Sequence, residues 1–113
     1  MKKIKMTLQT NNKTISNKTY NYIESNSYKI LKYNNLTLKF KLNTKSFIFI
    51  RETNEDIFKI EKKKGSITLK ELNTTFDIEL SKCTYTKEDN NYTIVYSIEG
   101  DNNEVKIKLK DLI

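Results

Sequence analysis

A two-residue alternation of apolar and polar side chains constrains this chain more than any other feature. Residues 36–42 read Leu-Thr-Leu-Lys-Phe-Lys-Leu, so the four apolar side chains fall on one face of a β-strand. The same pattern recurs at 4–8, 67–69, 76–80, 92–98 and 105–110. A helix needs apolar spacings of three and four residues over about ten positions, and no segment shows them clearly. Residues 55–63 fit either period. The sequence predicts an all-β chain.

Turn-forming residues separate the alternating segments. Clusters of Asn, Asp and Gly recur about every 8 to 12 residues, for example at 11–12, 34–35, 89–91 and 100–103. Asn and Gly tolerate positive φ, and Asn and Asp side chains bond to their own backbone, so each cluster can reverse the chain. This spacing predicts an antiparallel up-and-down meander of about eight to ten strands. Because closure removes exposed edges, we predict one barrel domain over residues 1–113.

The net charge and the length of the apolar runs limit what the protein can bind and where it can reside. The 113 residues carry 21 Lys+Arg against 14 Asp+Glu, a net charge of +7. This excess reflects either a lysine-biased composition or a surface that attracts anions, nucleic acid or anionic lipid. The charged start at 1–6 has no apolar stretch behind it, and the longest apolar run, 47–50, is too short to span a membrane. We expect a cytoplasmic protein with no membrane span.

Residue types that common enzymes need are missing. The chain has no His, which excludes imidazole metal sites and Ser-His or Cys-His pairs. The single cysteine, Cys83, follows Lys82; we favour a buried inert thiol over a reactive one. The turn at 64–66 lacks the glycines of a phosphate loop. We predict a protein that is not an enzyme and uses no metal or cofactor, with acid–base chemistry by scattered carboxylates as the alternative.

Arg51 stands out because it is the only arginine beside 20 lysines. It follows the run 47–50 and shares strand parity with Phe47 and Phe49, which places it at the mouth of the predicted barrel. There its guanidinium could hold a ligand carboxylate or phosphate. The alternative is a structural ion pair with Asp56 or with an acid on a neighbouring strand.

The seven tyrosines all fall on predicted strands and admit three interpretations. Inside a barrel they would line a cavity with rings and hydroxyls. Outside, interleaved with lysine, they would stack the bases of single-stranded nucleic acid. The third interpretation, which we favour, is that they pack across neighbouring strands. The predicted ligand-binding set is Arg51, Tyr28, Tyr33, Tyr92 and Tyr96.

The order of segments along the chain carries a family resemblance. A Lys/Ile-rich first strand precedes tyrosine strands at 20–22 and 28–33, a strand ending in Arg51, a Lys-Gly-Ser turn at 64–66, and strands at 75–78, 92–98 and 105–109. This order resembles the YwiB-like family, small bacterial proteins of unknown function. The resemblance implies a calycin-like (lipocalin-like) β-barrel and no established activity.

Three functions follow as hypotheses from the sequence. The first is a barrel that binds a small anionic or amphipathic ligand, because a barrel of about eight strands is wide enough for one small molecule. The second is weak, salt-sensitive binding of single-stranded nucleic acid by a basic, tyrosine-rich face. The third is a protein-interaction role, including a homodimer formed through an open sheet edge or a tyrosine-rich face.

Overall fold

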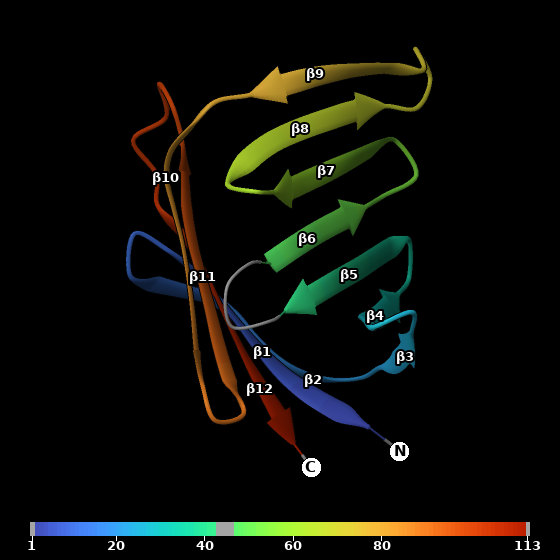
Figure 1. Cartoon of the computed structure of the whole chain (residues 1–113), viewed down its shortest axis with the longest axis vertical. Helices are drawn as coiled ribbons and strands as arrows, with labels where there is room; N and C mark the ends of the chain where they lie inside the picture. The colour runs from blue at the N-terminus through green and yellow to red at the C-terminus, as the bar shows by residue number, and fades with distance from the viewer. Residues whose placement is uncertain (1, 43–46, 113) are drawn as a thin grey trace. The chain divides into compact units, whose positions relative to one another are not determined.

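The computed structural model describes residues 2–42 and 47–112, and these residues form strands and turns without a helix (Figure 1). The strands are β1 (Lys3–Thr10), β2 (Lys13–Asn21), β3 (Ile23–Ser25), β4 (Tyr28–Tyr33), β5 (Leu36–Leu42), β6 (Phe47–Glu52), β7 (Asp56–Glu61), β8 (Lys64–Leu69), β9 (Thr74–Ile78), β10 (Leu80–Glu88), β11 (Asn91–Ile98) and β12 (Val105–Leu112). The all-β prediction is confirmed. No helix among these residues could cross a membrane.

The strands make two sheets, in which every neighbouring pair is antiparallel. One sheet has the order β10-β11-β12-β1-β2, and the other has the order β3-β4-β5-β6-β7-β8-β9. The chain divides into two compact units, one of Met1–Tyr22 with Leu80–Ile113 and one of Ile23–Glu79. Each unit holds one sheet. Within the described residues neither sheet closes on itself, so the antiparallel meander is found while closure into a barrel stays a prediction.

The five-stranded sheet joins the two ends of the chain. β1 pairs along its whole length with β12, from Lys3 opposite Leu112 to Thr10 opposite Val105. Alternate residues are buried on one face of this sheet, as the two-residue period predicts. The most deeply buried members are Ile4, Ile94, Ile107 and Leu109. The opposite face carries mostly polar side chains of the same strands, and Val95 is a buried apolar residue on it.

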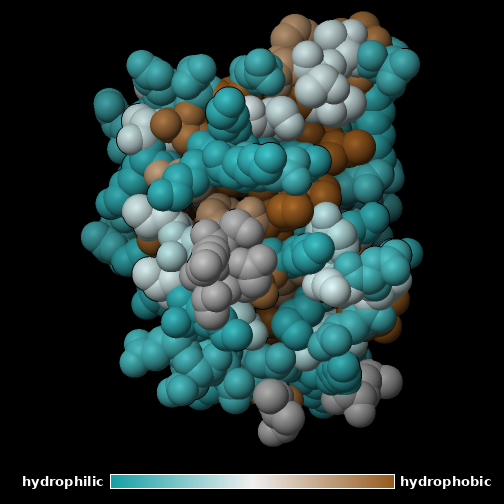
Figure 2. All heavy atoms as spheres, viewed as in Figure 1, coloured by the Kyte–Doolittle hydropathy of each residue, from teal (hydrophilic) through white to brown (hydrophobic). Residues whose placement is uncertain are grey.

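The seven-stranded sheet is a meander whose apolar side chains also gather on one face. Its buried members are Leu31, Leu38, Phe40, Phe47, Phe49, Phe58 and Ile60. The ambiguous stretch 55–63 contains the strand β7, and its alternation buries Phe58 and Ile60 together. Hydrophilic side chains cover most of the surface in view in Figure 2, and apolar atoms show between them.

Within residues 2–42 and 47–112, three hairpins turn through two residues that both have positive φ, the geometry that matches the twist of paired strands. Two of these turns, Asn11-Asn12 and Asn26-Ser27, include asparagine, which tolerates this backbone. The third, between β7 and β8, places Lys62 and Lys63 at φ 53° and 60°. Long side chains without a local hydrogen bond rarely adopt this region, so the lysine turn is strained in a way that the asparagine turns are not.

Candidate functional site

Three lysines share the solvent-facing side of the five-stranded sheet, and the strand register brings them together. Lys5 on β1 lies directly opposite Lys110 on β12. Lys108, two residues earlier on β12, projects from the same face. Together with their cross-strand neighbours these residues form two rows of three, Lys5–Lys110–Asn91 and Thr7–Lys108–Thr93. We call these six residues the lysine site.

The lysine site surrounds a depression of about 330 Å³. Its lining consists of Lys5, Thr7, Asn91, Tyr92, Thr93, Lys108, Leu109 and Lys110. Neighbouring strands lie about 5 Å apart and same-face residues on one strand about 7 Å apart. Three flexible ammonium groups anchored at such spacings can converge on one phosphate or carboxylate group.

The three lysines lack a carboxylate partner within the described part of the chain. Other lysines have one: Lys82 is 2.8 Å from Glu104, and Lys70 is 2.6 Å from Glu52. The closest acid along the Lys5–Lys110–Asn91 row is Glu88, which lies beyond Asn91 on β10. Like charges directly opposite across a strand pair destabilise a sheet. The lysine site is therefore a concentration of positive charge that the fold itself does not neutralise.

Neutral polar groups border these charges. Asn91 is exposed and Thr93 is half-buried, and both side chains can donate hydrogen bonds into the depression. The Thr7 hydroxyl instead donates to Asn17 Oδ1 at 3.3 Å, so it borders the site with its donor already engaged. The combination of three cations with two neutral donors suits an anion that has several acceptor oxygens.

Two further depressions belong to the seven-stranded unit, and both include carboxylates. One, of about 260 Å³, is lined by Lys32, Asn35, Thr37, Lys39, Glu52, Thr53, Asn54 and Lys70. The other, of about 320 Å³, is lined by Lys59, Glu61, Lys62, Lys64, Gly65, Ser66 and Asp77. Glu52 offsets one of the three lysine charges in the first depression. Glu61 and Asp77 offset two of the three in the second, where Lys59 Nζ lies 3.2 Å from Glu61. Among the three depressions, the one at the lysine site is the one whose charged lining residues are all lysines.

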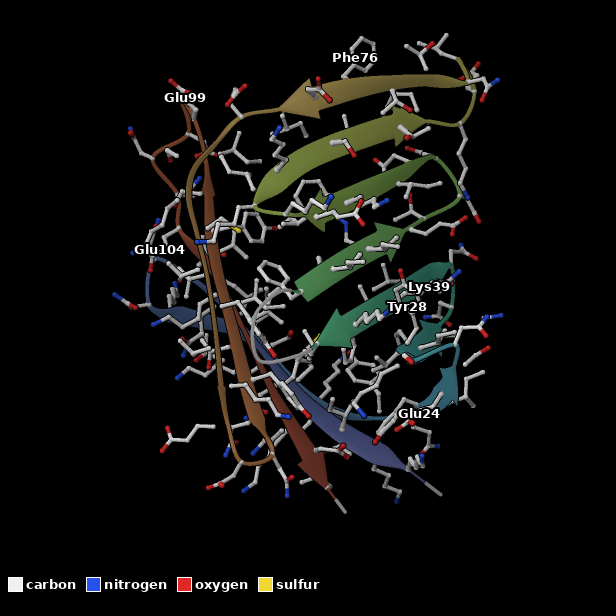
Figure 3. The ribbon with its side chains drawn as sticks, viewed as in Figure 1. Glu24, Tyr28, Lys39, Phe76, Glu99 and Glu104 are labelled. Carbon is white, nitrogen blue, oxygen red and sulfur yellow. The ribbon has the colours of Figure 1, made fainter. Side chains whose placement is uncertain are left out.

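The five residues predicted as a ligand-binding set are distributed over both units. Tyr92 and Tyr96 lie on the buried face of β11, with exposed fractions of 9% and 7%, and the Lys87 amine is 5.7 Å from the Tyr92 ring centre. Tyr28 and Tyr33 project from opposite faces of β4. Tyr28 shares its face with Lys39 (Figure 3), and Lys41 Nζ lies 5.9 Å from its ring centre.

Arg51 lies on β6, on the same sheet face as Phe47 and Phe49, as its parity predicts. Its side chain is exposed, and its guanidinium carbon is 5.4 Å from the ring centre of Phe58 on β7. Across the residues that the structure describes, Arg51 makes no ion pair; Asp56 accepts a hydrogen bond from the Thr53 hydroxyl at 3.1 Å instead. Tyr33 shares the face of Arg51, while Tyr28 lies on the other face, so the set does not converge within either unit.

Sequence reasoning missed the lysine site although part of its signal was present. The alternation over 105–110 already placed Lys108 and Lys110 on the outer face. The missing step was the pairing of the first strand with the last, which sets Lys5 against Lys110 and involves residues more than a hundred positions apart.

No group of three or more Cys, Asp or Glu side chains gathers as metal ligands within 2–42 and 47–112.

No family model matches the chain, and neither does any curated protein or solved structure. The resemblance to the YwiB-like family therefore stays a prediction from the order of strands.

Proposed function

We propose that this protein is a non-catalytic binding protein for small anions and that the lysine site holds the ligand. The observation that carries the proposal is the convergence of Lys5, Lys108 and Lys110 on one depression that no carboxylate lines. Such a surface raises the local concentration of anions. The arrangement costs stability, because two of the lysines oppose each other directly, and an anion bound between them removes this repulsion.

The ligand class follows from the donors. Lysine ammonium groups act as compact point charges and contact phosphate or carboxylate oxygens from several directions. A phosphate group with two negative charges uses all three lysines, and its remaining oxygens accept hydrogen bonds from Asn91 and Thr93. We therefore propose a small phosphorylated or polycarboxylate ligand. The site is open to solvent, so binding weakens as ionic strength rises.

The calycin-like barrel is a separate proposal, in which β9 would pair with β10 and keep no free edge. Its support is the strand order: β1 pairs with β12, a single residue separates β2 from β3, and a single residue separates β9 from β10. A meander in which the first strand pairs with the last is the order that an up-and-down barrel requires. The proposed anion site lies within the five-stranded unit and does not depend on closure.

Single-stranded nucleic acid is the less favoured ligand, because base stacking needs aromatic rings beside the lysines. Tyr20, Tyr85, Tyr92 and Tyr96 all lie on the face of the five-stranded sheet opposite the lysine site. By strand parity no aromatic ring projects from the described part of the lysine face, although Tyr92 is among the residues that line the depression. Phosphate contacts alone would give sequence-independent and strongly salt-dependent binding.

The test is a titration of isotope-labelled protein with inorganic pyrophosphate, followed by the amide shifts in two-dimensional NMR spectra. We expect saturable shifts confined to β1, β11 and β12. A variant with Lys5, Lys108 and Lys110 all changed to Gln should bind at least about tenfold more weakly. The matched control changes Lys62, Lys63 and Lys64 to Gln, because it removes the same charge from the other unit. Its affinity should stay within about twofold of the wild type.

Two results would overturn the proposal. One is an equal loss of affinity in both triple variants, which would mean that net charge alone drives binding. The other is a single-stranded oligonucleotide that binds at the lysine site more tightly than pyrophosphate at equal phosphate concentration, which would favour the nucleic-acid alternative.

A further inference from the structure

The seven-stranded sheet ends in β9, an edge strand without lysine or proline whose one charged residue is Asp77. β9 pairs with β8 alone and is outermost in its sheet (Figure 1). In natural proteins, lysine, proline or a short length keeps an edge strand from pairing with another chain. The other edge strands of the described sheets follow this rule, since β2 and β10 each carry two lysines and β3 has three residues. β9 reads Thr-Thr-Phe-Asp-Ile and has neither lysine nor proline.

Apolar side chains are exposed at this edge. Phe76, in the middle of β9, has an exposed fraction of 48%, and Leu72, just before the strand, has 63%. In Figure 3 the Phe76 ring projects beyond the ribbon of β9. Thr74, Thr75 and Asp77 are exposed as well. The edge therefore offers both backbone groups and an aromatic side chain to another strand.

The sequence of β9 is complementary to itself in one antiparallel register. With a two-fold axis at Phe76, the two phenylalanines face each other, Thr74 faces Ile78, and Thr75 faces Asp77. Apolar or β-branched side chains then meet on one face and polar side chains on the other. The carboxylate of Asp77 then faces the hydroxyl group of Thr75 in the second copy. A cross-strand aromatic pair adds to the stability of such a ladder.

A shift of the axis to Asp77 removes this complementarity. That register sets the two Asp77 carboxylates directly opposite each other, and like charges at this position destabilise a strand pair. Residues 71–79 carry Glu71, Asp77 and Glu79 and no lysine. Two such edges repel each other through like negative charges, and salt screens this repulsion.

We propose that β9 pairs antiparallel with β9 of a second copy of this chain, in the register centred on Phe76, to form a two-fold symmetric dimer. One short strand buries little surface, so the dimer is weak and concentration-dependent. The repulsion between two chains of charge +7 is screened by salt, so added salt strengthens the dimer. This dependence is opposite in sign to that of anion binding, and the two proposals stand or fall separately.

Sedimentation velocity from about 10 μM to about 1 mM protein tests self-association. We expect the weight-average mass of the wild type to rise with concentration, and to rise further at high salt. Phe76→Lys places a charge at the centre of the pair and should leave a monomer throughout. The control is Ile15→Lys, which introduces the same charge at an exposed isoleucine on the edge strand β2. It should associate like the wild type.

A wild type that stays monomeric at every concentration and salt level would overturn the dimer. An equal loss of association in both lysine variants would also overturn it, because the effect would then be one of net charge. Circular dichroism of each variant shows whether the strands are retained. The Lys5, Lys108 and Lys110 triple variant should dimerise normally even where it no longer binds pyrophosphate.

Cysteine cross-linking tests the register. In a Cys83→Ser background, Phe76→Cys sets two thiols opposite each other, and oxidised glutathione can take up the two electrons that the new disulfide releases. Asp77→Cys is the matched control, because its thiol faces Thr75 of the second copy. We expect covalent dimer from Phe76→Cys, and little from Asp77→Cys or from the background. Faster cross-linking of Asp77→Cys would rule out this register, and the sedimentation test needs no cysteine change.

Discussion

The Tyr22 hydroxyl lies 2.9 Å from each carboxylate oxygen of Asp111 and is placed to donate to both. Asp111 is the one buried charged residue among those described, and Tyr22 is buried beside it. The contact links the residue after β2 to β12, 89 positions later. A buried carboxylate is tolerated when hydrogen bonds replace the water it has lost.

Tyr22→Phe should therefore destabilise the protein by about 1 to 3 kcal/mol, because the buried carboxylate loses a donor without gaining water. Urea denaturation followed by circular dichroism measures the change. Tyr33→Phe is the control, since Tyr33 is half exposed; it should cost less than about 0.5 kcal/mol. Equal effects of the two substitutions would contradict a special role for the Asp111 contact.

Lys5→Glu should raise stability while it weakens anion binding. The substitution turns the like-charge pair with Lys110 into an opposite-charge pair, which adds about 0.2 to 1 kcal/mol at low salt. The gain should shrink in molar salt because the site is exposed. Lys3→Glu is the control, as Lys3 faces Leu112 on β12. A Lys5→Glu protein less stable than the Lys3→Glu protein at low salt would argue against repulsion at the lysine site.

The alternation of residue types predicted the strands because burial of one sheet face selects side chains locally. Residues 36–42 correspond to β5, and 105–110 lie within β12. The division into two sheets was not predicted. It depends on the breaks at Tyr22 and Glu79, where a continuous polar–apolar pattern passes from one sheet to the next. Such breaks are set by long-range pairing, which a local pattern does not record.

Prediction of the lysine site from the sequence has the same limit. The outward positions of Lys108 and Lys110 follow from parity, whereas the approach of Lys5 follows only from the β1–β12 register. Rarity of residue type did not point to the lysine site, because lysine is the commonest charged residue of the chain. Arg51 packs its guanidinium against the Phe58 ring, and Tyr92 and Tyr96 are in the core, which agrees with the favoured interpretation that tyrosines pack across strands.

The lysine turn between β7 and β8 should become more stable with residues suited to positive φ. Lys62→Asn with Lys63→Gly should add about 1 kcal/mol, because both replacements tolerate the left-handed region. Lys64→Gly is the control, since Lys64 is in a strand without positive φ and glycine there should destabilise. Thermal or urea unfolding compares the three proteins. A loss of stability in the double variant would show that the two lysines make contacts which outweigh the strain of the turn.

Acid should weaken the contact between Glu52 and Lys70. The hydrogen bond from Lys70 lowers the pKa of the Glu52 carboxyl below 4.5, desolvation partly opposes this, and the charges of Lys70, Lys39 and Lys32 lower the pKa further. A folded-state pKa below the unfolded value gives stability that is present above the unfolded pKa and is lost as pH falls through the folded one. The pH range over which this stability is lost therefore lies below about pH 4.5. The contribution is about 0.2 to 1 kcal/mol, the range of exposed ion pairs.

Glu52→Gln should consequently flatten the acid side of the stability curve between pH 5 and pH 3, because the amide has no proton to gain in that range. Urea unfolding at a series of pH values measures the slope for each protein. Glu99→Gln is the control: it removes a carboxylate from the exposed turn after β11 and should keep the slope of the wild type. If Glu52→Gln kept the full acid-side slope, the carboxylates that drive acid unfolding would lie elsewhere, and the pair with Lys70 would contribute nothing measurable.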